Sequence, residues 1–239
     1  GALKSPATQP LVTTMGEYDH EVDPRLVAGE PDNRILPVSG SLAPVPWLAS
    51  PTGQVIASHY AMSGEPAWMD PRHVLARVLE RFRSMGLKPV IATELEFYLV
   101  APGDGIAPRP LLGKIPGTGL EQHGIQYSMA EDMWQHDAFL DAVRIACEQQ
   151  AVPMTTMLSE FAPGQWEINT HHVDDPLLAC DHALLLKRIV KGVALQHGMS
   201  ATFMAKPFAG SGGNGLHMPA SLYDGEGNNV FADPDSDAT

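Results

Sequence analysis

The chain contains little cysteine, few basic residues and no long hydrophobic segment. Its 239 residues include two cysteines, Cys147 and Cys180, which are too few for a disulfide framework or a cysteine-based metal site. There are 15 Lys and Arg against 28 Asp and Glu, giving a net charge of −13. This balance argues against a nucleic-acid-binding surface, because neutralising phosphates requires clustered basic side chains. No run approaches the roughly 18 apolar residues of a membrane span, and the first residues lack a signal-peptide pattern. We therefore expect a cytoplasmic protein that binds neither nucleic acid nor membranes.

The distribution of helical signals predicts two domains. Residues 1–69 are rich in proline and carry short extended runs but no convincing helix. Helical signals then begin abruptly, with Asp70 as a good N-cap, Pro71 at the first helical position and Gly86 at the end. We therefore predict an N-terminal domain over residues 1–69 and a second domain over residues 70–239.

Strands and helices alternate through the second predicted domain. This alternation, without a dinucleotide-binding fingerprint or a P-loop, predicts an α+β fold with an antiparallel or mixed sheet flanked by helices. Ser128 and Glu131 have the spacing of a capping box. The expected elements are strands over 88–100, 154–158 and 202–205, a further strand carrying His217, a long loop over 101–127, and helices over 137–150 and 176–197.

Two carboxylates share one face of the strand expected over 88–100. Glu94 and Glu96 alternate with Leu95 and Phe97, so the acidic and apolar side chains point to opposite faces. Strand geometry places the two carboxylates about 7 Å apart, which allows each to reach a different metal ion. A solvated strand face would give the same local pattern, so the companion residues must decide.

The other candidate metal ligands lie in two further segments of the chain. Glu160 and Glu167 bracket the tight turn 163–165, which would bring their carboxylates toward one another. His217 follows a glycine-rich turn, although a lone histidine is more often a hydrogen-bonded core residue than a ligand.

The carboxylates lie in apolar or glycine-rich stretches, where an uncompensated charge is expensive to bury. Lys206 is the only lysine or arginine near these segments, and it is either a phosphate-binding group or a surface lysine. Oxygen ligands with one imidazole suit Mg²⁺ or Mn²⁺, and two such ions would balance four carboxylates. Asn214 and Ser221 could hydrogen-bond a substrate or only stabilise a turn.

Four motifs, in order and with matching spacing, resemble the glutamine synthetase family from about Asp32 to the end of the chain. The family fold implies a small β-grasp N-terminal domain and a catalytic domain built on a curved antiparallel sheet. The motifs are Glu94-Leu95-Glu96-Phe97, Pro163-Gly164-Gln165-Trp166-Glu167, Met204-Ala205-Lys206-Pro207-Phe208, and Gly213-Asn214-Gly215-Leu216-His217 with Ser221-Leu222.

The resemblance also implies roles for individual residues. It assigns Gly213 to glutamate binding and Ser221 to ATP binding. It implies a first metal ion held by Glu96, Glu160 and Glu167, and a second held by Glu94 and His217.

The chemistry implied is an ATP-dependent ligation. ATP phosphorylates the γ-carboxylate of glutamate, and an amine then displaces phosphate from the acyl phosphate. The implied partners are glutamate, ATP and an amine, with two Mg²⁺ or Mn²⁺ ions per site. The implied assembly is a homo-oligomer, a dodecamer in the family.

Two departures from the family pattern bear on the substrates. The second histidine of the family's His-x-His is replaced by Pro219, and Gly212 stands where an asparagine is expected. Residues 15–20 do not match the Asp-Gly-Ser-Ser segment of the ammonia-using members. The stretch 32–47 and the turn around Glu167 look closer to γ-glutamyl-amine ligases, such as γ-glutamylputrescine synthetase. We therefore favour an organic amine or polyamine over ammonia.

The third departure is length, because the chain is shorter than family members, as if truncated at its C-terminal end. The remaining catalytic residues are expected beyond residue 239, so we expect the chain alone to be inactive. Ordinary ammonia-using glutamine synthetase stays an alternative. A non-catalytic structural or regulatory relative is another.

Overall fold

The computed structural model describes residues 7–10, 32–103 and 108–232, and it confirms the predicted α+β class. The chain divides into two compact units, residues 1–43 with 53–86, and residues 44–52 with 87–239. The domain boundary at residue 69 stays a prediction. Residues 15–20, which we compared with the ammonia-using members, lie outside the described part.

Among its described residues, the first unit has a three-stranded antiparallel sheet and one helix. The sheet has the order β1-β2-β5, and the helix is α2, which begins at Pro71 as predicted. A further two-stranded sheet pairs β3 with β4. The bounds are β1 (Ala7–Pro10), β2 (Asp32–Pro37), β3 (Ala43–Pro44), β4 (Gly53–Gln54), β5 (Ala57–Tyr60) and α2 (Pro71–Ser84).

Asp70 fixes the start of α2. Its carboxylate accepts hydrogen bonds from the backbone nitrogens of Arg72 and His73, at 2.9 and 3.2 Å. It also accepts from the backbone nitrogen of His59 at 2.9 Å, which joins the helix to β5. The cap therefore acts both locally and across the unit.

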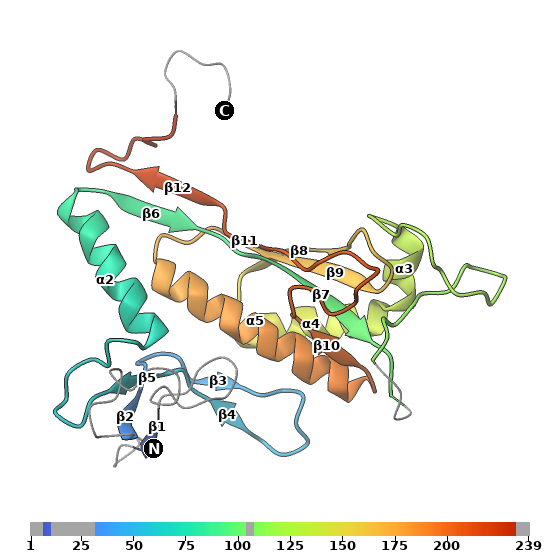
Figure 1. Ribbon diagram of the computed structural model, residues 1–239, viewed down its shortest axis with the longest axis horizontal. Coiled ribbons are helices and arrows are strands. Elements are labelled where there is room, and N and C mark those ends of the chain that lie inside the picture. Colours follow the sequence, from blue (N-terminus) through green and yellow to red (C-terminus); the bar gives the residue numbers. More distant parts are fainter. Residues whose placement is uncertain (1–6, 11–31, 104–107, 233–239) are drawn as a thin grey trace. The chain divides into compact units, whose positions relative to one another are not determined.

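A five-stranded antiparallel sheet forms the centre of the second unit (Figure 1). Strand β7 is central, with β9 along one edge and both β10 and β11 along the other. Strand β8 pairs with β9 on the outside. The bounds are β7 (Glu94–Val100), β8 (Met154–Ser159), β9 (Gln165–Thr170), β10 (Ser200–Thr202) and β11 (Leu216–His217).

Helices α4 (Asp137–Gln149) and α5 (Pro176–Gln196) lie side by side along the sheet, and α3 (Ala130–Gln135) packs near β8 (Figure 1). Alternation along β7 and β9 directs one set of side chains into the core and the other to the opposite face. No helix in the described ranges is long and apolar enough to cross a membrane. The fully buried core side chains include Leu95, Phe97, Leu99, Trp166, Ile168, Leu186 and Ile189.

The strand expected over 88–100 is in fact two strands. Strand β6 (Lys88–Ile91) pairs with β12 (Ala220–Tyr223), whereas β7 belongs to the large sheet. The break lies at Ala92, whose backbone nitrogen donates to Pro219 O, and Thr93, whose backbone nitrogen donates to Thr170 Oγ1. The two halves therefore pair with different partners, which the continuous extended pattern did not reveal.

Two further local predictions were wrong. Ser128 has a φ of +57° and its backbone nitrogen donates to Ser159 O, so it caps no helix. Instead α3 begins after Met129, without a side-chain cap. The strand expected over 202–205 is β10, which ends at Thr202 because its pairing with β7 ends opposite Tyr98.

Candidate metal centre

One face of the large sheet carries the predicted acidic residues. Glu94 lies opposite Asn169, and Glu96 lies opposite Glu167, in adjacent antiparallel strands. On the other edge of β7, His217 of β11 lies opposite Glu94. The register therefore gathers side chains from three segments that are far apart in the sequence.

Three of these side chains form a compact group. Ligand atoms of Glu96, Glu167 and His217 all lie within 4.8 Å of one another. Glu94 adjoins the group, with its Oε2 at 3.1 Å from His217 Nδ1. The His217 side chain is 61% exposed and that of Glu94 is 31% exposed, so the group opens to solvent.

Glu160 lies outside this compact group. Its Oε2 accepts a hydrogen bond of 2.8 Å from the backbone nitrogen of Phe161, the next residue. It is nevertheless close enough that its charge acts on Glu167. The sequence-based assignment placed Glu96 and His217 on different metal ions, whereas the structure brings both into the same group.

The neighbouring carboxylates of this group repel one another when they are ionised and no cation is bound. Burial raises the pKa of Glu167, and the nearby charges of Glu160, Glu94 and Glu96 raise it further, while a hydrogen bond with Asn169 lowers it. In the described ranges, none of these four glutamates forms an ion pair with Lys or Arg. Lys206 instead donates to Ser211 O.

The surroundings fit a divalent cation in two respects. Asn169 Oδ1 is buried and has no hydrogen-bond partner in the described part of the chain. At Gly215 a Cβ would lie 2.6 Å from Glu96 Oε1 and 3.1 Å from His217 Cε1, so the missing side chain leaves space for these two donors. Carboxylate oxygens with one imidazole form a donor set suited to Mg²⁺ or Mn²⁺.

Gln165 and Asn169 are site residues that our sequence analysis did not single out. Gln165 Nε2 donates to Glu96 Oε2 and to Gly213 O, both at 2.8 Å. It thereby ties the glycine-rich loop to the metal-ligand face. The alternation that revealed Glu94 and Glu96 applies to β9 as well, since Gln165, Glu167 and Asn169 share one face.

The structure also places the predicted substrate-binding residues, Gly213 and Ser221, and the two residues that depart from the family pattern, Gly212 and Pro219. Gly213 meets the acidic face through Gln165, whereas Ser221 lies opposite Val90 in the β6–β12 sheet. The carbonyl of Pro219 accepts from Ala92. The carbonyl of Gly212 accepts from the Tyr98 hydroxyl at 2.9 Å.

The catalytic-domain model of glutamine synthetase matches residues 68–239. This chain therefore belongs to the glutamine synthetase family. It is 34% identical over 235 residues to γ-glutamylputrescine synthetase PuuA of Escherichia coli (strain K12), covering 97% of this chain and 49% of that protein. It is 35% identical over 209 residues to glutamate–isopropylamine ligase of a Pseudomonas species, covering 87% and 44%.

A solved structure described as a GmaS/ADP complex superposes with a TM-score of 0.74 at 28% identity. The match covers 87% of this chain and 46% of that one. The chain thus spans about half the length of the curated relatives it matches. The family is enzymatic, and these two relatives are named as glutamate–amine ligases.

Proposed function

We propose that the chain forms part of an ATP-dependent ligase that joins the γ-carboxylate of glutamate to an organic amine. The single observation that carries this proposal is the convergence of Glu96, Glu167 and His217 on one sheet face. The named substrates of two relatives, putrescine and isopropylamine, support an organic amine rather than ammonia.

The proposed reaction has two steps. The γ-phosphoryl group of ATP passes to a γ-carboxylate oxygen of glutamate, and ADP leaves. The amine nitrogen then forms a bond to the acyl carbon, the bond from that carbon to the phosphate oxygen breaks, and phosphate and a proton are released. Mg²⁺ or Mn²⁺ would neutralise charge between the triphosphate and glutamate when bound.

The residues of this chain hold and orient the reacting groups. Glu94, Glu96, Glu160, Glu167 and His217 would supply the metal ligands, in agreement with the resemblance. Gln165 fixes the carboxylate of Glu96, and Asn169 hydrogen-bonds with Glu167. Ligands anchored in this way by neighbouring polar groups bind metal more tightly than free side chains do.

Two experiments test the proposal. Calorimetric titration of Mn²⁺ into the chain should show binding that Glu167→Ala abolishes and Glu226→Ala, at an exposed turn, leaves intact. Phosphate release by the whole protein should require glutamate, ATP and an amine. Metal binding without turnover on any amine would favour the alternative of a non-catalytic relative, and turnover on ammonium alone would restore ordinary glutamine synthetase.

A further inference from the structure

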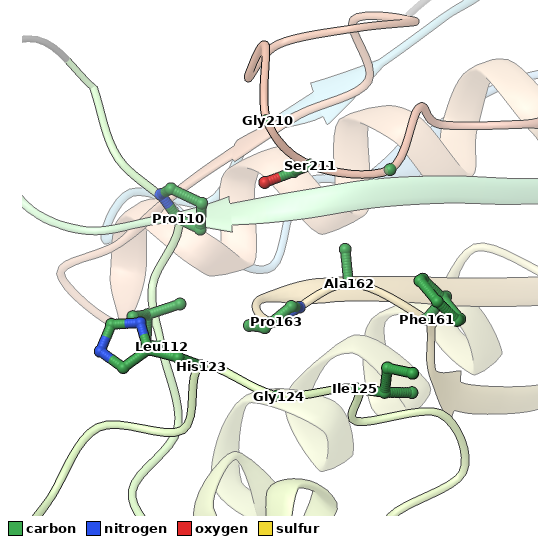
Figure 2. Close-up of a pocket in the computed structure, with 11 residues that line it drawn as sticks. Pro110, Leu112, His123, Gly124, Ile125, Phe161, Ala162, Pro163, Gly210 and Ser211 are labelled. Carbon is green, nitrogen blue, oxygen red and sulfur yellow. The ribbon is translucent and has the colours of Figure 1, made fainter.

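Gln126 contacts the turn that connects two of the candidate metal ligands. This turn, residues 160–164, joins β8 to β9, with Glu160 at its start and Glu167 further along on β9. Figure 2 shows residues 123–125, which lead into Gln126, running alongside residues 161–163 of the turn. Gln126 is only 1% exposed, so its side chain belongs to the interior of the second unit.

The side-chain amide of Gln126 is hydrogen-bonded to the turn through both its nitrogen and its oxygen. Its Nε2 donates to Gln165 O at 2.6 Å, and its Oε1 accepts from the backbone nitrogen of Gly164 at 3.1 Å. The backbone nitrogen of Gln126 also donates to Phe161 O at 3.3 Å. A buried amide that satisfies two backbone groups in this way fixes their positions relative to each other.

A further contact joins Gln126 to the end of β8. The hydroxyl of Ser159, which is fully buried, donates to Gln126 O at 2.9 Å. Glu160 therefore lies between two residues, Ser159 and Phe161, that are both hydrogen-bonded to Gln126. Its own backbone nitrogen donates at 2.9 Å to Gln165 O, the same oxygen that accepts from Gln126. The backbone of Glu160 is thus held by contacts that all involve Gln126.

The other end of the turn has contacts of its own. The carbonyl of Gly164 accepts from the backbone nitrogen of Leu99 at 3.0 Å. Gly164 has a φ of +81°, and a Cβ there would lie 2.8 Å from Leu111 O, so the backbone is closely packed at this point. Without the Gln126 side chain, this end would stay in place, whereas the end that carries Glu160 would be free to shift.

We propose that Gln126 is a positioning residue for the metal centre, and that it acts by keeping the Glu160 carboxylate within reach of a cation held by Glu96, Glu167 and His217. The inference rests on the proposed function, in which these side chains bind a divalent cation. Glu160 Oε2 accepts from the backbone nitrogen of Phe161 outside the compact group. It reaches a shared cation by side-chain rotation only if its backbone stays in position, because Mg²⁺ and Mn²⁺ bind oxygen ligands over a narrow range of distances.

Gln126→Met tests this role, because it removes the donor and the acceptor but keeps an unbranched side chain of similar length. Gln150→Met is the matched control, since Gln150 is a buried glutamine at the end of α4 whose Nε2 donates to Pro44 O at 2.7 Å. Both variants should lower the melting temperature. Only Gln126→Met should weaken Mn²⁺ binding in calorimetric titration, by about tenfold. Parental affinity in Gln126→Met, or an equal loss in the control, would overturn the inference.

A double-mutant cycle identifies the ligand through which Gln126 acts. Glu160 lies outside the compact group, so Glu160→Ala should retain measurable Mn²⁺ binding. In that background Gln126→Met should cost no further affinity, because the carboxylate that it positions is gone. In a Glu94→Ala background the loss of about tenfold should remain, since Glu94 lies on β7 and not on the turn. A full loss in the Glu160→Ala background would contradict the proposed role.

Ser159→Ala decides the question if Gln126→Met is too unstable to titrate. It removes the hydroxyl that donates to Gln126 O and leaves the glutamine amide in place. Mn²⁺ affinity should fall by about threefold, as expected for the loss of one neutral hydrogen bond. Parental affinity in Ser159→Ala would then count against the inference.

Failure of the proposed function gives a different result from failure of this inference. In the first case no amine, ammonium included, supports phosphate release by the whole protein, yet Gln126→Met still weakens Mn²⁺ binding. In the second case the whole protein releases phosphate with an amine, and Gln126→Met binds Mn²⁺ as tightly as the parent.

Discussion

The side-chain amide of Gln165 donates a hydrogen bond of 2.8 Å to the carboxylate of Glu96. The same nitrogen donates to Gly213 O at 2.8 Å, so one buried amide joins the metal-ligand face to the glycine-rich loop. This relationship gives Gln165 a positioning role that can be separated from ligation.

Replacing Gln165 by leucine should weaken metal binding while all the acidic residues stay in place. Loss of the hydrogen bond frees the Glu96 carboxylate to adopt other rotamers, and outer hydrogen-bond partners of this kind contribute roughly 10- to 100-fold in affinity. Mn²⁺ titration by calorimetry measures the effect, and Gln149→Leu on the exposed face of α4 is the control. Unchanged affinity in Gln165→Leu would show that Glu96 is held by other contacts.

Gly215→Ala should reduce metal affinity by about tenfold with little loss of stability. Its Cβ would lie 2.6 Å from Glu96 Oε1, and that carboxylate can swing away at small cost because it is the end of a flexible side chain. Once displaced, the Glu96 carboxylate is no longer held in position to bind the metal ion. Gly225→Ala, where a Cβ meets nothing within 4 Å, is the matched control. A fall in melting temperature without a change in Mn²⁺ affinity would contradict the expected order of effects.

As the pH is lowered, metal binding should begin to weaken at a higher pH than it would if Glu167 had the ordinary pKa of a glutamate. Burial and neighbouring carboxylates raise the pKa of Glu167 above its usual 4.5. Its raised value means that the metal-free fold binds this proton more readily than the unfolded chain does. Lowering the pH from 7 toward 4.5 therefore favours the protonated, metal-free form. The increase in melting temperature caused by Mn²⁺ should shrink over that interval.

The same stabilisation by Mn²⁺ should be small at every pH in Glu167→Gln. That variant without metal should melt no lower than the parent at pH 7, because a desolvated charge has been removed. A parent protein whose Mn²⁺ response stays constant down to pH 4.5 would argue against a role for Glu167 in binding.

Asp70→Ala should lower the free energy of unfolding by about 1–2 kcal/mol, because three backbone N–H groups lose their acceptor. Burial alone raises the pKa of Asp70, but hydrogen bonds from His59 and His73 outweigh it, so the net pKa lies below 3.8. Its contribution is therefore full above pH 3.8 and is lost as the pH falls through the lowered value. Urea unfolding across this range measures it, and Asp70→Asn should lose less because it still caps the helix.

Cys147 should resist thiol reagents in the native protein. Burial raises its pKa to about 12, so at pH 8 only about one thiol in ten thousand is ionised. Burial also raises the pKa of Cys180. Reaction with a disulfide reagent at pH 8 should be slow until guanidinium exposes both thiols, and rapid native labelling of Cys147 would show that α4 opens locally.

Predictions based on local signals were the most accurate. The start of α2 followed from Asp70 and Pro71, because capping is settled within one or two turns. The helices expected over 137–150 and 176–197 match α4 and α5, although α4 has no side-chain cap. The capping box at Ser128 failed because a tertiary hydrogen bond to Ser159 holds that residue in a left-handed conformation. Likewise, the break at Ala92 depends on strands β12 and β9, which arrive from distant parts of the chain.

The family, the α+β class and the acidic face of β7 could all be predicted from the amino-acid sequence, because motif spacing and strand alternation are properties of neighbouring residues. The fold was needed to show that Glu96, Glu167 and His217 form one compact group, with Glu94 beside it and Glu160 outside it. It also revealed that Gln165 joins Glu96 to the glycine-rich loop. These contacts depend on which strands pair and in which register. Such pairing joins segments that are far apart in the sequence, so no single segment predicts it.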